Sequence, residues 1–233
     1  MDPMQKAPHQ EAPFNTVPPI VWALSLLMIG VEAAFWLGAQ GLIGGPSAVG
    51  WRIAAFEGYG FSGSYFDWMI ERGQYPLDGL RRFVTYPFLH GGFGHALFGA
   101  VITLAVGKVV ADSLGQARVL LIFFAGAVLG ALAWGLILSD TRLLVGAFPG
   151  AYGLIGAFTY LLFLKLEAQG APRFRAFMLI GVLMGLQLVF GAFSSFASTE
   201  WFADLVGFAV GFGLTILLVP GGWGRLVSAL RRR

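Results

Sequence analysis

The 233-residue sequence contains no cysteine and few charged residues, and both shortages exclude classes of protein. Without cysteine, the chain has neither a disulfide framework nor a thiolate metal site. Only 12% of the residues are charged, whereas 57% are hydrophobic and the mean hydropathy is positive. A soluble domain of this length cannot bury so much apolar surface. The composition therefore predicts an integral membrane protein, surrounded by membrane lipids and with no nucleic acid partner.

Six apolar stretches are each long enough to cross a hydrocarbon core of about 30 Å as a helix of roughly 20 residues. The stretches lie at 19–41, 90–111, 117–138, 149–166, 174–196 and 200–219. They lack the alternation of barrel strands, so the sequence predicts an all-α membrane protein with six transmembrane helices in one domain, 19–219. Residues 1–18 lack the features of a signal peptide and are predicted to form a disordered tail, and 220–233 a basic tail.

Positive charges are unevenly divided between alternate connecting segments. One set holds ten of the fifteen Lys and Arg residues and includes both termini. By the positive-inside rule, both termini are predicted to be cytoplasmic, most simply in a bacterial inner membrane. The last three arginines can also attract anionic headgroups, at about 1 kcal/mol per charge.

One connection, 42–89, is far longer than the others, which predicts structure or function of its own. Within it, YGFSGSYFDWMIERG places Tyr65, Trp68 and Met69 near helical spacing, with charged residues toward the other side. This pattern predicts a partly helical outer loop with an amphipathic helix. The helix is interpreted as an interfacial anchor or, alternatively, as a cap over a ligand.

Four local patterns occur in a characteristic order. RRFVTYPFLH at 81–90 is similar to a Trp-Arg loop that runs into a second membrane helix, and His95 follows it. VGAFPGAYGLIGAF at 145–158 and WFADLVGFAVGFG at 201–213 are similar to a fourth and a sixth helix. Together, these patterns resemble the rhomboid family of intramembrane serine proteases. The resemblance implies a six-helix, rhomboid-like bundle and extends over nearly the whole chain.

The catalytic residues of that family are missing from this sequence. Aligned on the family pattern, Phe148 stands at the serine nucleophile, Asp204 at the histidine base and Gly99 at the oxyanion-stabilising asparagine; His95 is retained. Phenylalanine has no heteroatom with which to attack a carbonyl carbon, and losing one oxyanion donor alone typically costs about 10²–10³ in rate. The resemblance therefore implies a pseudoprotease, in which we expect Phe148 to fill the space beside Gly99.

Two alternatives concern other chemistry at the same region. A one-residue shift would place Pro149 at the nucleophile, which is equally inert, and a displaced serine would have to come from Ser139, Ser194, Ser195 or Ser198. An active protease with an unrecognised nucleophile thus stays as an alternative. His90 and His95 are about 140° apart around a helix, so no metal site and no cofactor are expected.

Two acidic residues lie inside predicted spans, where a carboxylate is costly and usually functional or paired. For Asp204 we expect a structural hydrogen bond to Tyr152, which the resemblance places beside it. Glu32 is expected to contact the outer loop or a partner subunit. A transporter that uses Asp204 or Glu32 is a second alternative, although no chain of polar residues crosses the predicted bundle.

Glycines are spaced to allow close approach of helix backbones in lipid. The predicted packing glycines of the fourth and sixth helices are Gly146, Gly150, Gly153, Gly156, Gly207 and Gly211. Two further pairs, Gly126/Gly130 and Gly181/Gly185, have the same spacing.

By analogy with inactive rhomboid-like proteins, the expected function is the binding of other membrane proteins. The chain would recognise a partner's transmembrane helix, help assembly or quality control, or serve as a subunit of a larger complex. The surface between the second and fifth helices is the expected contact.

Overall fold

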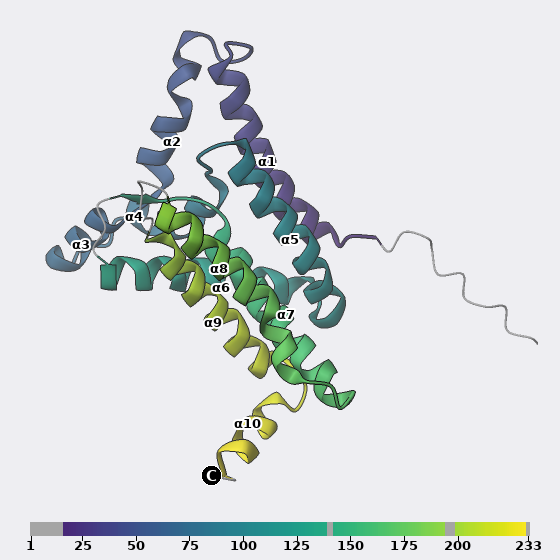
Figure 1. Ribbon diagram of the computed structural model, residues 1–233. Helices are drawn as coiled ribbons and strands as arrows, with labels where there is room; N and C mark the ends of the chain where they lie inside the picture. Colours follow the sequence, from purple (N-terminus) through teal and green to yellow (C-terminus); the bar gives the residue numbers. More distant parts are fainter. Residues whose placement is uncertain (1–15, 139–141, 194–198, 232–233) are drawn as a thin grey trace, which may run out of the picture.

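The computed structural model describes residues 16–138, 142–193 and 199–231, and it is almost entirely helical (Figure 1). The predicted tail 1–18 lies mostly outside the described residues. In the described part of the chain, five helices are long and apolar enough to cross a membrane. They are α1 (Pro19–Ala39), α5 (Phe93–Leu114), α6 (Gln116–Leu138), α7 (Phe148–Ala168) and α9 (Glu200–Leu218). Their bounds follow the predicted spans to within three residues.

The remaining predicted span, 174–196, corresponds to a 3₁₀ turn η3 (Arg173–Phe177) and helix α8 (Met178–Phe193), while its last three residues lie outside the described part. A Cβ at Gly207 would meet the carbonyl of Pro149, and one at Gly211 the carbonyl of Gly153. The contact positions move in the same direction along both helices, from 149 to 153 and from 207 to 211, so α7 and α9 run parallel. The intervening chain must therefore return across the bundle. Residues 173–193 are long enough, because helix rises about 1.5 Å per residue and 21 residues span roughly 30 Å.

The long connection after α1 is partly helical, as predicted, and forms a layer at one end of the bundle. Its elements are η1 (Pro46–Gly50), α2 (Trp51–Tyr59), β1 (Phe61–Ser62), α3 (Gly63–Arg72), α4 (Leu77–Thr85) and η2 (Tyr86–Phe88). Strand β1 pairs antiparallel with β2 (Leu143–Leu144), which ties the layer to the segment before α7. Figure 1 shows α1 and α2 leaning together at the top of the view, far from α10 (Gly222–Arg231). The predicted basic tail 220–233 thus contains a helix.

Helix α3 is the amphipathic helix that the sequence predicts. The Ser62 hydroxyl accepts a hydrogen bond from the Tyr65 backbone N–H and so caps the helix start. Phe66 and Met69 are buried, whereas Trp68 is 38% exposed and its ring stacks on Tyr65. The expected grouping of Trp68 with Met69 is therefore wrong, because Met69 is buried against Gly79 of α4 whereas Trp68 is exposed.

The core divides into two apolar clusters. One lies among α1, α5, α6 and α7, includes the buried Met28, Phe123 and Leu154, and also contains Ile180 of α8. The other joins the outer layer to α6 through Phe61, Tyr86 and Trp134, and the Tyr86 hydroxyl donates to the carbonyl of Ala127. The outer layer is thus packed onto the membrane helices rather than loosely attached.

Small residues bring α6, α7 and α9 into backbone contact. Gly156 lies against the carbonyl of Phe208 and Gly150 against Phe123, whereas Gly153 faces the carbonyl of Ile122 as well as α9. Other glycines of these helices, Gly126, Gly130, Gly207 and Gly211, also face neighbouring backbone. On α8 the expectation is wrong: among the described residues, a Cβ at Gly181 or Gly185 would have no atom within 4 Å, so these glycines make no close helix contact there.

Candidate functional site

The positions that resemble a catalytic site come together where the outer ends of α5, α7 and α9 meet. Helix α7 begins at Phe148, and Pro149 suits its first turn because the proline N–H would be unpaired there anyway. Gly146, just before the helix, has φ of 111°, a conformation that favours glycine. A Cβ at Gly146 would also lie only 2.8 Å from the His95 Nε2. The start of α7 is therefore built around a glycine that lets His95 approach.

Phe148 lies against His95. Their rings are stacked, with centroids 5.0 Å apart and planes 16° apart, and the Phe98 ring also contacts Phe148, with a centroid distance of 5.9 Å. Phe148 is half-buried. The Phe148 ring therefore packs directly against the imidazole of His95.

The space beside Gly99 is occupied by other groups than expected. A Cβ at Gly99 would lie 3.5 Å from the Cβ of Ala147 and 3.5 Å from the Nε2 of His90. The expectation that Phe148 fills this space is wrong, because its ring turns toward His95 instead. His90, which the sequence did not link to Gly99, stands there.

The two histidines are held by backbone donors. The Ala147 N–H donates to His90 Nε2 at 3.4 Å, and the Gly91 N–H donates to His95 Nδ1 at 3.2 Å. Their rings meet edge to face, with centroids 5.1 Å apart. Burial, aided by His95 and Arg52, lowers the pKa of His90 to about 4, so His90 is neutral at pH 7. Among the described residues, no group of three His, Cys, Asp or Glu side chains fits a metal ion.

Glu32 forms the ionic contact between the membrane helices and the outer layer. Its carboxylate, 1% exposed, accepts two hydrogen bonds from Arg52 of α2, at 2.7 and 2.8 Å. Arg52 also donates to the carbonyl of His90 at 2.5 Å. The expected contact of Glu32 with the outer loop is therefore formed, and it reaches the segment that carries His90. We call Glu32, Arg52 and the His90 carbonyl the outer clamp.

Asp204 is buried and linked to Tyr152 indirectly. The Gln187 amide donates to Asp204 Oδ2 at 2.7 Å, and its carbonyl oxygen accepts from the Tyr152 hydroxyl at 3.2 Å. The expected direct bond between Asp204 and Tyr152 is therefore wrong, because the amide stands between them. Sequence reasoning missed Gln187, although it is the only polar side chain in α8.

Neither described imidazole is hydrogen-bonded to a serine. His90 and His95 accept from backbone N–H groups, as described above. The alternative nucleophiles Ser139, Ser194, Ser195 and Ser198 lie outside the residues that the structure describes. The geometry supplies imidazole groups without an adjacent nucleophile in the described part of the chain.

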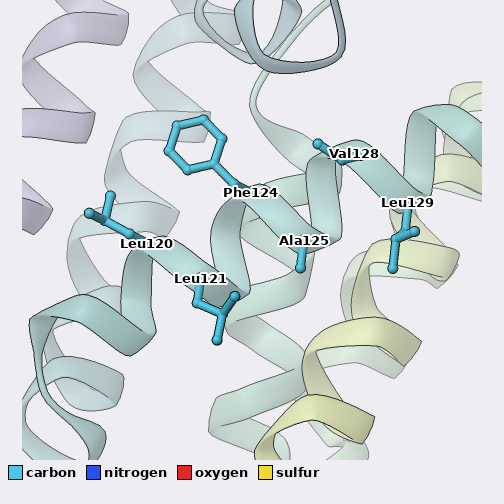
Figure 2. A pocket seen from close by; sticks show the side chains of 6 residues that line it. All are labelled: Leu120, Leu121, Phe124, Ala125, Val128 and Leu129. Carbon is cyan, nitrogen blue, oxygen red and sulfur yellow. The ribbon is translucent and has the colours of Figure 1, made fainter. Parts of the chain in front are cut away.

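A shallow apolar hollow lies away from this region, on the outward side of α6. It is lined by Leu120, Leu121, Phe124, Ala125, Val128 and Leu129, whose side chains carry no polar atom (Figure 2). The hollow can hold a hydrocarbon chain but offers no chemistry for a reaction.

Comparison with known proteins identifies the family to which this chain belongs. The rhomboid domain matches residues 78–221, from α4 to the end of α9. The chain belongs to the rhomboid family. The match begins after α1, α2 and α3, so the family pattern is narrower than the resemblance drawn from the sequence. The protein named "Putative rhomboid protease YdcA" from Bacillus subtilis (strain 168) is 24% identical over 194 residues, which cover 82% of this rhomboid chain and 86% of that protein.

Proposed function

We propose that this rhomboid protein is a non-catalytic member of a family of intramembrane serine proteases. The observation that carries the proposal is Phe148, which takes the nucleophile position and stacks on the retained His95. A hydroxyl and a base in contact are needed to form an acyl-enzyme. The side chains that meet here are an aromatic ring and an imidazole.

The other two catalytic positions support the same proposal. Asp204 Oδ2 accepts a hydrogen bond from the Gln187 amide, so this oxygen is not available to activate a hydroxyl. Gly99 brings no donor, and the nearest polar atom to it, His90 Nε2, already accepts from the Ala147 N–H. An oxyanion would meet His95 but no second side-chain donor. The loss of one such donor alone lowers the rate by about 10²–10³.

The function that remains for such a fold is recognition. We infer that this protein binds the transmembrane helix of another membrane protein, on the surface between α5 and α8. Phe98 and Val101 of α5 are about half exposed, and so are Val182 and Leu186 of α8. In lipid, helices associate by packing and not by the hydrophobic effect, so an uneven apolar face favours one partner over lipid.

A photo-crosslinking amino acid tests this surface directly. Placed at Phe98 or Val182 in the cell membrane, it should give an adduct of one defined mass. The matched control is Leu136 of α6, which is 56% exposed on a different helix. Adducts at Leu136 equal to those at Phe98 and Val182, or a smear without a defined mass, would contradict the proposed surface.

The name of the Bacillus subtilis relative, a putative rhomboid protease, favours one other function, proteolysis within the membrane. Purified protein should then cleave a transmembrane substrate and react with a fluorophosphonate probe. We expect neither signal. Labelling at a single serine would identify the displaced nucleophile and replace the proposal.

We also propose a bacterial inner membrane location with both termini in the cytoplasm. The support is the charge distribution, with ten of fifteen basic residues in the segments assigned to that side.

A further inference from the structure

The hollow on the outward side of α6 lies between two rows of side chains. One row is Leu120, Phe124 and Val128, and the other is Leu121, Ala125 and Leu129 (Figure 2). Residues four apart are neighbours on a helix surface, so each row runs along the helix. Ala125 is the smallest residue of either row. Its short side chain leaves space between Leu121 and Leu129.

Aromatic packing supports one side of the hollow. The Phe124 ring meets the Phe88 ring of η2 and the Phe123 ring, with centroid distances of 6.2 and 5.4 Å. Phe123 belongs to the buried core, and Phe124 packs against that core. Phe124 is therefore held back from the space in front of Ala125. The hollow has a volume of about 470 Å³, within the range of roughly 300–1,000 Å³ that is usual for sites of small molecules.

A basic residue lies at one end of the hollow. Arg118 stands three residues before Leu121 and seven before Ala125, spacings that place residues on one face of a helix. Its side chain is exposed, and one N–H donates to the carbonyl of Leu114 at 3.0 Å. A guanidinium group has five N–H donors in a fixed fork. The exposed side chain can therefore also bind two oxygens of a phosphate group.

The turn that carries this charge is well defined. Gly115 joins α5 to α6, and the Gln116 side-chain oxygen accepts from the Ile20 N–H of α1 at 3.2 Å. Asp112, the acidic residue nearest to this turn in the sequence, is paired with Lys108 at 2.6 Å. Its negative charge is therefore compensated locally, which leaves Arg118 suited to an external anion.

The length of the hollow fits one leaflet of a bilayer. Leu129 lies eleven residues after Arg118, which is about 17 Å along the helix at 1.5 Å per residue. Half of a hydrocarbon core is about 15 Å thick. A phospholipid has the same arrangement, with phosphate at the membrane boundary and a hydrocarbon chain directed inward. A partner's transmembrane helix would instead continue to the opposite boundary, beyond the end of the hollow.

We propose that α6 holds one anionic phospholipid, with its phosphate at Arg118 and one acyl chain in the hollow between Leu121 and Leu129. In the orientation proposed above, this lipid belongs to the cytoplasmic leaflet, whose anionic headgroups attract basic residues. The site goes beyond the proposed function and does not depend on it, since the hollow lies on α6 and the recognition surface on α5 and α8.

Photoactivatable lipids test the site in the full chain. The purified protein is placed in nanodiscs of phosphatidylcholine that contain a small fraction of phosphatidylglycerol with a diazirine in one acyl chain. After illumination, mass spectrometry locates the labelled residues, and we expect them to be concentrated at 120–129. Phosphatidylcholine with the same diazirine, at the same fraction, should label 120–129 about fivefold less, the effect of one basic charge near a membrane surface.

Two variants of Arg118 test the charge. Arg118→Gln keeps a donor for the Leu114 carbonyl but has no charge, so labelling of 120–129 by phosphatidylglycerol should fall about fivefold. Arg118→Lys keeps the charge and should be labelled nearly as strongly as the parent.

A filled hollow tests the shape. Ala125→Phe places a ring between the two rows and should remove the concentration of label at 120–129. The matched control is Ala23→Phe on α1, where the alanine is also exposed to the surroundings of the bundle. Ala23 belongs to the same end of the bundle, because the start of α1 is bonded to Gln116. This control should leave the labelling of α6 unchanged.

Three results would overturn the lipid site. The first is labelling of exposed α1 residues such as Leu26 as strong as that of 120–129, which would leave a second copy or a partner helix as the occupant. The second is equal labelling of 120–129 by the two lipids. The third is an Arg118→Gln variant that is labelled like the parent. If Ala125→Phe does not fold, the comparison of Arg118→Gln with Arg118→Lys decides.

Discussion

At the scale of single residues, the proposal that this protein is non-catalytic rests on Phe148. The variant Phe148→Ser restores a hydroxyl next to His95, but Asp204 and Gly99 are unchanged. We expect no cleavage of a transmembrane substrate and no labelling by a fluorophosphonate probe, because His95 accepts the Gly91 N–H at Nδ1 and so carries its own proton on Nε2, while Asp204 is bound to the Gln187 amide. The comparison is the triple variant Phe148→Ser, Asp204→His, Gly99→Asn, which carries all three groups of the family's catalytic site. Cleavage by the single variant would show that this interpretation of the site is wrong.

His90 makes stability depend on pH in a defined range. Burial lowers its pKa from 6.5 to about 4, so between these values the unfolded chain binds a proton that the folded one does not. The contribution of His90 to the free energy of unfolding is therefore fully present above pH 6.5. It decreases by about 1.4 kcal/mol per unit as the pH falls toward 4.

The variant His90→Gln keeps an acceptor for the Ala147 N–H but does not titrate. Unfolding in mixed detergent, measured at intervals from pH 7.5 to 4.5, should be less sensitive to pH in this variant than in the parent. Parallel curves of unfolding free energy against pH for the two proteins would contradict the assignment of this pH dependence to His90.

The residues of the site were only partly predictable from the sequence. Phe148, Asp204 and Gly99 are placed at the catalytic positions by the resemblance to the rhomboid family, and this alignment stays a prediction. Gln187 and the place of His90 were not predicted, because they depend on how far neighbouring helices rotate. A lone amide in the apolar run of α8 was nevertheless a visible signal, since polar groups in lipid require partners.

At the scale of helices, glycine packing gives a matched pair of substitutions. A Cβ at Gly211 would overlap the carbonyl oxygen of Gly153, whereas one at Gly181 has no atom within 4 Å. Gly211→Ala must push α7 and α9 apart, and we expect it to cost about 3 kcal/mol or more. Gly181→Ala should be neutral or slightly stabilising, by up to about 1 kcal/mol, because alanine favours helix.

Thermal unfolding of both variants in one detergent measures the difference. Equal melting temperatures for Gly211→Ala and Gly181→Ala would show that the α7–α9 contact does not hold the bundle together.

The helices themselves were largely predictable, since apolar runs of the right length must be helical in lipid. Spacing alone did not show which glycines pack, since Gly181/Gly185 and Gly207/Gly211 have the same pattern but different surroundings. The strand pairing of Phe61 with Leu144 was also missed, because two-residue strands leave no periodic signal.

At the scale of the whole molecule, the outer clamp couples the outer layer to the bundle. Arg52→Met would leave the buried Glu32 carboxylate without its cation, which typically costs about 3 kcal/mol or more. The double variant Arg52→Met, Glu32→Met removes both charges and should be more stable than Arg52→Met alone. Unfolding free energies of the two single variants and the double variant give the coupling. Additive effects would contradict the clamp.

The arrangement of the chain in the membrane gives the last prediction. Because α7 and α9 run parallel, we expect the chain between them to cross back, so that the chain crosses the membrane six times with both termini on one side. With both termini in the cytoplasm, as proposed above, reporters active only in the cytoplasm should report at the N-terminus, at the C-terminus and after Gln169, where α7 has ended. A reporter inserted after Arg142, before α7, should be silent, and this insertion is the control. Signal at the N-terminus without signal at the C-terminus would mean that 173–193 does not cross. The parallel arrangement of α7 and α9 would then be wrong as well, since one cannot hold without the other.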